Sequence, residues 1–252
     1  MSDWNPNKYL LFKNQRTQPA IDLAKRVEKY NPKAIADIGC GPGNSTAVLR
    51  EVFPNADIID IDSSQNMIDR AKKEHADIKF LECSAEELSG KYDLLFSNAC
   101  LQWTPDHERL IPELISKLTE NGVLAVQMPM NLDEPLFRII KDVAANGKWD
   151  FSSVHFEKND TLTPKEYFDI LSRSSSSFEI WETVYYHAMP SHEQLIEWVR
   201  GTRLRPYLDV LNDMQKAEFE QDILSKVKTA YQRTDSGEVI LKFRRFFFIA
   251  QK

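Results

Sequence analysis

The chain has 252 residues, of which 42% are hydrophobic and 11% aromatic, so it can bury a sizeable core. This composition excludes a chain that is mainly disordered or of low complexity. The 38 acidic residues outnumber the 32 Lys and Arg residues, and the net charge of −6 argues against non-specific nucleic-acid binding through a basic surface. Any anionic ligand must therefore meet a local cluster of positive charge.

The cysteines and the apolar stretches bear on where the protein works. Cys40, Cys83 and Cys100 form no C-x-x-C pair, which is typical of reduced thiols in a cytoplasmic protein. The first residues lack a positive segment followed by an apolar run, so no signal peptide is predicted. No apolar stretch approaches the roughly 20 residues that span a bilayer. We therefore expect a cytoplasmic protein with no membrane partner.

The first half of the chain alternates strand and helix patterns. Apolar residues at helical spacing predict a helix that ends before Pro32, one at about 44–53, one that begins after Ser63 or Ser64, and one that contains Leu110 to Leu118. A turn is expected at Asn121–Gly122. Short apolar runs predict strands at 34–38, 57–61, 78–81, 92–96 and 123–127. Alternation of this kind indicates a parallel sheet covered by helices on both faces.

The second half has a different pattern. Residues 130–172 look helical and irregular, and helices are expected at about 191–200 and 213–231. Strands are expected at 179–189 and 243–250, the latter after a turn at Ser236–Gly237. The predicted fold class is α/β, with a Rossmann-like, seven-stranded, mostly parallel sheet, helices on both faces and a small helical cap inserted in the C-terminal half.

Three of the eight glycines, Gly39, Gly41 and Gly43, follow the first predicted strand. Glycines there let the backbone turn tightly and approach a ligand closely. A dinucleotide site would read G-x-G-x-x-G, whereas here the spacing is G-x-G-x-G and Asn44 takes the sixth place. Asp37 precedes the first glycine, and its carboxylate would repel a pyrophosphate but could hold a cationic amino acid.

A second carboxylate completes this pattern. Asp62 ends the second predicted strand, 19 residues after Gly43. An acid at that place can bind both hydroxyls of a ribose. Asp37, the glycines and Asp62 together describe a site for an adenosine joined to an amino acid without phosphates, which is S-adenosylmethionine (SAM). The alternative is a glycine turn that packs without a ligand, and the agreement of strand, glycines, helix start and distal acid disfavours it.

The segments Asp37-Ile-Gly-Cys-Gly-Pro-Gly43 and Asp62-Ser-Ser resemble the class I SAM-dependent methyltransferases. Within that family the chain resembles in particular the members that methylate trans-aconitate. The glycine loop is family-wide, while the stretches near the two ends are more specific. The matching stretches are 2–6, 41–46, 101–103, 122–129, 185–187, 189–192 and 204–206.

This resemblance implies transfer of a methyl group from SAM to a carboxylate of trans-aconitate, giving the monomethyl ester and S-adenosylhomocysteine (SAH). Asp37 and the glycine loop would hold the methionine part, Asp62 the ribose, and Met67 would pack on adenine. We expect one domain over residues 1–252, with a SAM-binding half at about 1–130 and a substrate-binding cap with the final strands at about 131–252. The expected cofactor-binding residues are Asp37, Gly39, Gly41, Gly43, Asp62, Met67, Ser84 and Asn98.

Two positions depart from the family pattern. Asp60 stands where members often have glycine, two residues before the ribose carboxylate, and its negative charge could weaken the site slightly. Ser84 stands where many members have an aspartate that bonds the adenine amino group, and a hydroxyl accepts that bond more weakly. Ser84 also begins a capping-box pattern with Glu87, so an adenine contact and a helix cap both stay open.

The implied chemistry needs few special groups. A carboxylate acceptor is already ionised at pH 7, so its methylation requires no general base. We therefore predict no catalytic acid or base and no metal, and we expect positioning and exclusion of water to provide the rate. Aromatic residues can line and cover such a site, although core packing is the alternative for each. The candidates are Trp4, Tyr9, Trp103, Tyr185 and Tyr186.

A small tricarboxylate bound by an acidic protein requires local positive charge. Arg200, Arg203 and Arg205 form the densest cluster, and Arg245 belongs to a second one. Arginine suits carboxylates because its planar fork can bond both oxygens. Arg205 lies in a family-like Leu-Arg-Pro, whereas relatives often have glycine in place of Arg203. The alternative for these residues is a solvated helix face or a salt bridge to nearby acids.

Other functions stay open at this point. The chain could methylate another small acid or a quinone precursor. An NAD-dependent dehydrogenase is disfavoured by the glycine spacing and by Asp37, while a non-catalytic SAM-binding module is compatible with the motif. The sequence indicates no oligomeric state.

Overall fold

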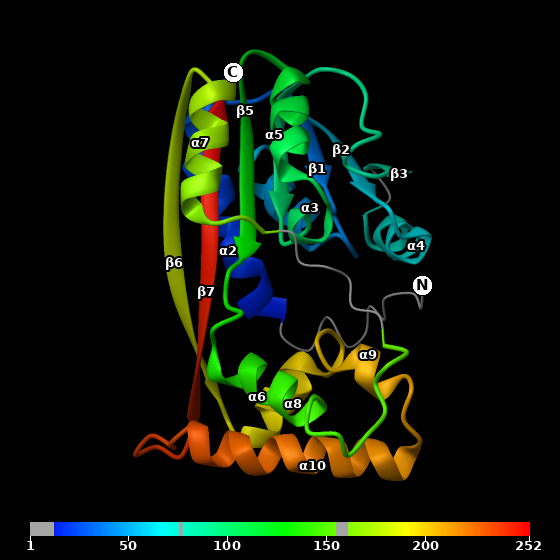
Figure 1. Ribbon diagram of the computed structural model, residues 1–252. Coiled ribbons are helices and arrows are strands. Elements are labelled where there is room, and N and C mark those ends of the chain that lie inside the picture. The colour runs from blue at the N-terminus through cyan, green and yellow to red at the C-terminus, as the bar shows by residue number, and fades with distance from the viewer. Residues whose placement is uncertain (1–12, 76–77, 155–160) are drawn as a thin grey trace. The chain divides into compact units, whose positions relative to one another are not determined.

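The computed structural model describes residues 13–75, 78–154 and 161–252. Its sheet has seven strands in the order β3-β2-β1-β4-β5-β7-β6 (Figure 1). Strands β1 to β5 are parallel, and β7 runs antiparallel to β5. The predicted mostly parallel α/β sheet is therefore confirmed. The strands are β1 Ala34–Ile38, β2 Asp57–Asp62, β3 Lys79–Glu82, β4 Tyr92–Asn98, β5 Leu118–Pro129, β6 Ser177–Met189 and β7 Val239–Gln251.

The central strands form because their residues are apolar on both faces. Ile35 and Ala36 of β1, Leu95 of β4 and Val123 and Leu124 of β5 are all fully buried. Residues that point to opposite faces of a strand can both be buried only where each face of the sheet is covered. The helices that accompany this sheet are α2 Lys13–Val27, η2 Glu28–Tyr30, α3 Asn44–Val52, α4 Gln65–Glu74, η3 Leu101–Trp103, α5 His107–Ser116 and α7 Pro164–Ser174.

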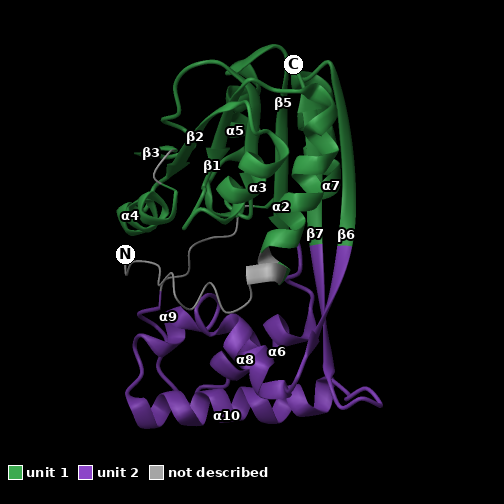
Figure 2. Cartoon of the chain, turned by 180° about the vertical axis from the view of Figure 1, so that it is seen from behind, with its two compact units in different colours: residues 1–129, 158–183, 245–252 green, residues 130–157, 184–244 purple. Residues whose placement is uncertain are grey.

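The chain divides into two compact units (Figure 2). Unit 1 comprises residues 1–129, 158–183 and 245–252, and unit 2 comprises 130–157 and 184–244. In unit 2, Trp149 and Phe219 meet edge to face with ring centroids 5.0 Å apart, an arrangement that aromatic pairs prefer. The single domain over 1–252 stays a prediction. The helices of unit 2 are α6 Pro135–Ala144, α8 His192–Arg200, α9 Arg205–Leu208 and α10 Asp213–Ala230.

The junction between α5 and β5 differs from the sequence-based expectation. Leu118 was expected to continue the helix, and Asn121–Gly122 to form a turn before the strand. In the structure α5 ends at Ser116, and Leu118 already pairs with Tyr92 of β4. The register then shifts, and Asn121 lies inside β5 with φ +64°. The expected turn residues therefore form an irregularity within a longer strand, a use of left-handed backbone that helical periodicity does not reveal.

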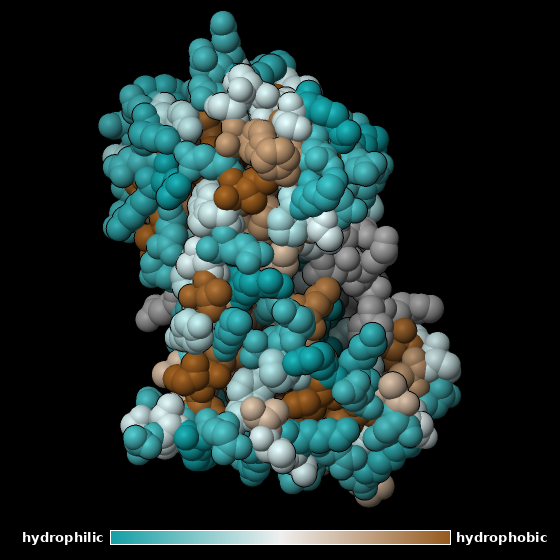
Figure 3. All heavy atoms as spheres, turned by 60° about the vertical axis from the view of Figure 1, so that its left-hand side comes forward, coloured by the Kyte–Doolittle hydropathy of each residue, from teal (hydrophilic) through white to brown (hydrophobic). Residues whose placement is uncertain are grey.

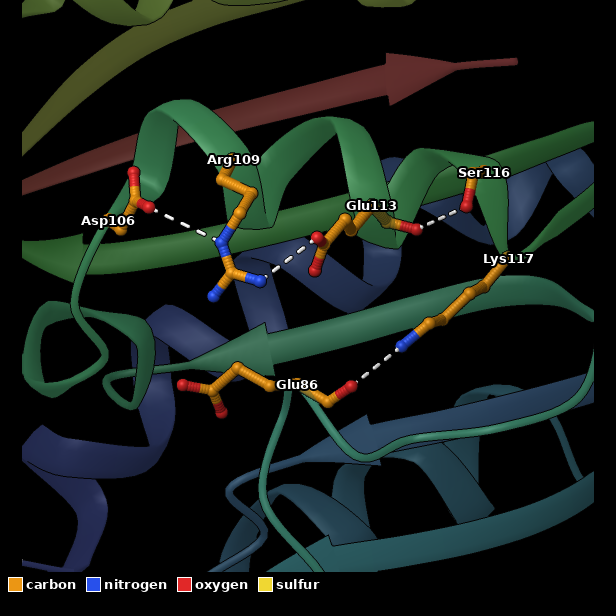
Figure 4. Close-up of polar contacts among 6 residues, drawn as sticks. All are labelled: Glu86, Asp106, Arg109, Glu113, Ser116 and Lys117. Carbon is orange, nitrogen blue, oxygen red and sulfur yellow. Dashed lines mark hydrogen bonds and ion pairs between the residues drawn. The ribbon is translucent and has the colours of Figure 1, made fainter.

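Polar contacts fix the ends of α5 (Figure 4). The Arg109 guanidinium bonds the carboxylate of Asp106 at 3.3 Å and that of Glu113 at 3.1 Å. At the other end, Lys117 Nζ donates to the backbone carbonyl of Glu86 at 3.1 Å. The second contact ties the loop after β3, which carries Ser84, to the end of the helix.

The molecular surface shown in Figure 3 is mixed in character. Hydrophobic residues lie there in separate patches with hydrophilic residues between them. Among the described residues, no helix combines the length and the apolar character needed to cross a bilayer.

Candidate functional site

The glycine loop closes over the carboxyl ends of β1 and β2. The backbone N–H groups of Gly39 and Cys40 both donate to the carbonyl of Ile61, at 2.8 and 3.0 Å. Gly39 has φ +74°, and a Cβ built on it would lie 2.2 Å from the Cys100 sulfur. Gly41 has φ +57°, and among the described residues no atom beyond its two chain neighbours lies within 4 Å of the place a Cβ would take. The loop is thus tightly packed at Gly39 and open at Gly41.

Asp62 ties this loop to the start of the next helix. Its Oδ2 accepts from the N–H of Gly41 at 3.0 Å, and its Oδ1 accepts from the N–H of Ser64 at 2.9 Å. The Ser64 hydroxyl in turn accepts from Met67 N and caps α4, as predicted. A carboxylate has about four lone-pair sites, so a carboxylate at this place can accept from more than one donor, such as the two hydroxyls of a ribose.

Asp37 is fully buried at the end of β1. Its Oδ2 accepts a 2.5 Å bond from the Ser45 hydroxyl at the start of α3, whereas its Oδ1 has no hydrogen-bond partner among the described residues. Burial raises the pKa of Asp37 well above its usual range, and the charges of Asp60 and Asp62 add to the rise. A buried acceptor without a donor is costly, and a cationic ammonium group would satisfy it.

Three further expected cofactor residues lie in unit 1. Met67 is buried on α4, and Asn98 ends β4 with a buried Oδ1 that has no partner among the described residues. Residues near Ser84 form a turn rather than a helix, so the residue caps no helix. The Ser84 N–H donates to the Glu87 carboxylate at 3.1 Å, and the Ser84 hydroxyl also bonds that carboxylate and helps lower the pKa of Glu87. The Ser84 oxygen can still accept a bond.

These features fit SAM. The acceptors of Asp37 and Asn98 that lack a partner within the described ranges suit donors such as ammonium and hydroxyl groups, and the space that the described residues leave at Gly41 allows close approach of a ligand. Asp62 presents a carboxylate at the end of β2. Because β1, β2 and β4 are parallel, their carboxyl ends lie at one edge of the sheet (Figure 1), which is where ligands bind in this kind of sheet.

The residues expected to bind substrate are divided between the units. Trp103 in η3 and Arg245 in β7 belong to unit 1. Arg245 is buried, and one of its nitrogens donates to Gln127 Oε1 at 3.4 Å. Trp4 and Tyr9 lie outside the described residues. Unit 2 contains Arg200, Arg203, Arg205, Tyr185 and Tyr186.

The arginines of unit 2 have different surroundings. Arg200 bonds Glu220 of α10 through two nitrogens at 2.8 Å each and also bonds Glu197, so it connects α8 to α10. The guanidinium carbon Cζ of Arg203 lies 5.8 Å from the ring centroid of Phe137. Burial lowers the pKa of Arg203. Arg205 forms a longer ion pair with Asp209 at 3.8 Å. The salt-bridge alternative is therefore best supported for Arg200.

The tyrosines of unit 2 also differ. Tyr186 is 67% exposed, whereas Tyr185 is partly buried and stacks parallel to His187 with ring centroids 6.4 Å apart. Their place at a substrate site stays a prediction.

Sequence reasoning did not find several residues that shape the site. Ser45 and Thr46, in the first turn of α3, bond Asp37 and Asp60. Cys100 fills the space beside Gly39, and Gln127 contacts Arg245. Two adjacent hydroxyls after a glycine loop are a visible signal, but the contacts of Cys100 and Gln127 depend on pairing between distant strands.

Comparison with known proteins agrees with this geometry. Residues 31–189 match the family model described as a methyltransferase domain. The trans-aconitate 2-methyltransferase of Escherichia coli O139:H28 is 41% identical over 254 residues, covering 100% of this chain and 99% of that protein.

Solved structures show the same fold at low sequence identity. The YcgJ protein of Bacillus subtilis has a TM-score of 0.64 at 12% identity and covers 93% of this chain and 98% of its own. The plantazolicin methyltransferase BpumL, solved in complex with SAH, has a TM-score of 0.52 at 15% identity and covers 98% of this chain and 90% of its own.

Proposed function

The chain belongs to the family of the trans-aconitate 2-methyltransferases, and on that premise we propose that it transfers a methyl group from SAM to a carboxylate of trans-aconitate. The products are the monomethyl ester and SAH. The observation that carries this proposal is the 41% identity to a trans-aconitate 2-methyltransferase over the whole chain. The arrangement of Asp37, the glycine loop and Asp62 at one edge of the sheet supports it.

The bound cofactor supplies an electrophilic methyl group. We assign Asp37 Oδ1 to the cofactor ammonium group, because this buried acceptor lacks a partner among the described residues. Asp62 is assigned to the ribose hydroxyls and Met67 to the adenine face. The backbone of Gly39, Gly41 and Gly43 would border the methionine part, with Ser84 and Asn98 as further polar contacts.

The residues of the chain need only bind, orient and exclude water. The acceptor carboxylate is already ionised at neutral pH, so no side chain has to remove a proton from it. Fixing two reactants in line contributes up to about 7–11 kcal/mol to the barrier reduction. Because a cationic donor meets an anionic acceptor and charge is neutralised, a site with little water favours the reaction.

Substrate recognition is assigned to arginines. Arg205 is the first candidate, because it lies in a family-like segment and arginine suits carboxylates. Arg203 and Arg245 are further candidates, since both guanidinium groups are largely buried and a buried guanidinium favours an anionic ligand. Arg200 is the weakest candidate because two glutamates already bond it.

The experiment that tests this function is incubation with isotope-labelled SAM and a panel of small acids and quinone precursors, with products resolved by mass. We expect the labelled methyl group on trans-aconitate in preference to the other acids. Preferential labelling of another acid or of a quinone precursor would establish the alternative acceptor, and SAH binding without any turnover would indicate a binding module. The cytoplasmic location and the lack of a nucleic-acid partner stay predictions.

A further inference from the structure

Two buried aspartates lie side by side in the candidate cofactor site. Asp37 of β1 and Asp60 of β2 are register partners on adjacent parallel strands, and both side chains are 0% exposed. Neighbouring strands are about 4.8 Å apart, and paired residues point to the same face of the sheet. The two carboxyl groups therefore lie in the same layer, a few ångströms from each other.

Both carboxyl groups are held in the same way by α3. The hydroxyls of the consecutive residues Ser45 and Thr46 donate to Asp37 Oδ2 and to Asp60 Oδ2, respectively. Asp37 Oδ1 and Asp60 Oδ1 are buried and have no hydrogen-bond partner among the described residues. Each carboxyl group thus has one satisfied and one unsatisfied oxygen, and a proton on either group would supply the missing donor.

The charged groups around the pair act in opposite directions. Asp62 and the neutral thiols of Cys40 and Cys100 lie on the loop side, and the electrostatic interaction of Asp62 raises the pKa of Asp37 further. Arg50 of α3 acts on Asp60 and lowers its pKa. The register partners on the flanking strands are uncharged: Phe96 of β4 pairs with Asp37, and Phe80 of β3 pairs with Asp60.

Two carboxylates this close and this deeply buried cannot both ionise easily. Burial raises the pKa of Asp60 to about 7, although the Thr46 bond and Arg50 oppose the rise, and it raises the pKa of Asp37 as well. The pair therefore retains a proton near neutral pH.

We propose that Asp37 and Asp60 share one proton in the cofactor-free protein and that binding of the cofactor's ammonium group to Asp37 releases it to solvent. Asp60 is then a positioning residue that acts through Asp37 and makes cofactor affinity depend on pH. This inference rests on the proposed function, because that function brings the ammonium group to Asp37.

The sign of the pH dependence follows from linkage. A ligand that releases up to one proton binds more tightly as pH rises, by up to tenfold per pH unit, while the free pair still holds its proton. The dependence disappears once the free pair is fully ionised. The opposite trend would require proton uptake on binding.

The test is calorimetric titration with SAH at pH 6.5, 7.0 and 7.5, in buffers of different ionisation enthalpy. The slope of the binding enthalpy against buffer enthalpy gives the number of protons released. For the parent protein we expect most of one proton at pH 6.5, about one half at pH 7.0 and less at pH 7.5, because the pKa of Asp60 is raised to about 7. We expect close to none for Asp60→Asn, because the amide can donate to Asp37 and keep it ionised. Asp57→Asn, an exposed position on the same strand, should match the parent.

The outcomes separate this inference from the function on which it rests. SAH binding without proton release, or equal release from the parent and Asp60→Asn, would overturn the shared proton and leave the function intact. Absence of SAH binding to the parent would overturn both. If Asp60→Asn does not fold, Thr46→Val takes its place. Loss of the hydroxyl bond that favours ionised Asp60 should extend proton release to higher pH, and an unchanged pH range would count against the pair.

Discussion

The buried acids of unit 1 and the arginines of unit 2 differ in the partners that surround their charged groups. Asp37 and Asp60 are fully buried, accept bonds from hydroxyls and each retain an oxygen without a partner among the described residues. Arg200 is partly exposed and is bonded by Glu220 and Glu197. A buried acid that lacks a donor can accept a hydrogen bond from a cationic ligand. An arginine already bonded by two carboxylates mainly stabilises contacts between helices.

The largest expected effect tests the tightly packed part of the glycine loop. In Gly39→Ala the new Cβ meets the Cys100 sulfur, and the residue must keep φ +74°. We expect a loss of roughly 2–5 kcal/mol in the free energy of unfolding, from backbone strain and overpacking together. Urea unfolding measures it. Gly147→Ala is the matched control, because its φ is +80° and no described residue beyond its chain neighbours lies within 4 Å of the added atom. Equal losses in both variants would contradict the packing argument.

The second prediction separates two arginines of unit 2. If Arg205 binds a carboxylate of the substrate, Arg205→Ala should lower kcat/KM for trans-aconitate by the equivalent of about 2–4 kcal/mol and leave SAH affinity nearly unchanged. Arg205→Lys should recover only part of the loss, because an ammonium group lacks the bidentate fork. Arg200→Ala should reduce thermal stability with little change in kcat/KM. A large loss of kcat/KM in Arg200→Ala, with only a loss of thermal stability in Arg205→Ala, would indicate that Arg200 binds the substrate instead.

The third prediction concerns the link between the glycine loop and β2. Asp62→Ala removes the acceptor for the N–H groups of Gly41 and Ser64 as well as the proposed ribose contact. Hydrogen bonds to charged groups contribute about 1.5–3 kcal/mol each, so SAH binding should weaken by at least that amount. Calorimetric titration at pH 7.5 measures the change, with Asp57→Ala as the control on the same strand. Parent-like affinity would remove Asp62 from the site.

The smallest expected effect is on stability against pH. The pKa of Asp60 is raised in the folded protein to about 7, so the folded state binds more protons than the unfolded state between about pH 4 and 7. The parent should therefore lose stability as pH rises through that range. Asp60→Asn lacks this loss, and we expect it to gain about 2–2.5 kcal/mol relative to the parent between pH 5 and pH 7.5. Chemical denaturation at both pH values gives the difference. A parallel dependence in the two proteins would show that Asp60 is ionised throughout.

The two regions also differ in how far the sequence predicts them. Asp37, the glycines, Asp62 and the Ser64 cap lie within 28 residues, and strand and helix periodicity places them at one edge of the sheet. The prediction that the helix α5 includes Leu118 is wrong, because Leu118 pairs with Tyr92 of β4 and belongs to strand β5.

Contacts between distant segments explain most of what the sequence did not indicate. The partner of Arg200 is 20 residues away, and that of Arg245 is 118 residues away. The sequence-based expectation for Asp60 was only a slight weakening of the site by its charge. The register of β1 against β2 places it beside Asp37 instead, and that pairing is a property of the sheet rather than of either segment alone.

The central claim is carboxyl methylation of trans-aconitate, and the most direct test is the chemical stability of the product. The protein is incubated with trans-aconitate and methyl-labelled SAM, and the product is treated with mild alkali. If the product is a methyl ester, it carries one added methyl group on trans-aconitate. Mild alkali then releases the label from this product as methanol. A label that survives alkali, on carbon, nitrogen or an ether oxygen, would contradict the account, as would the absence of any labelled trans-aconitate.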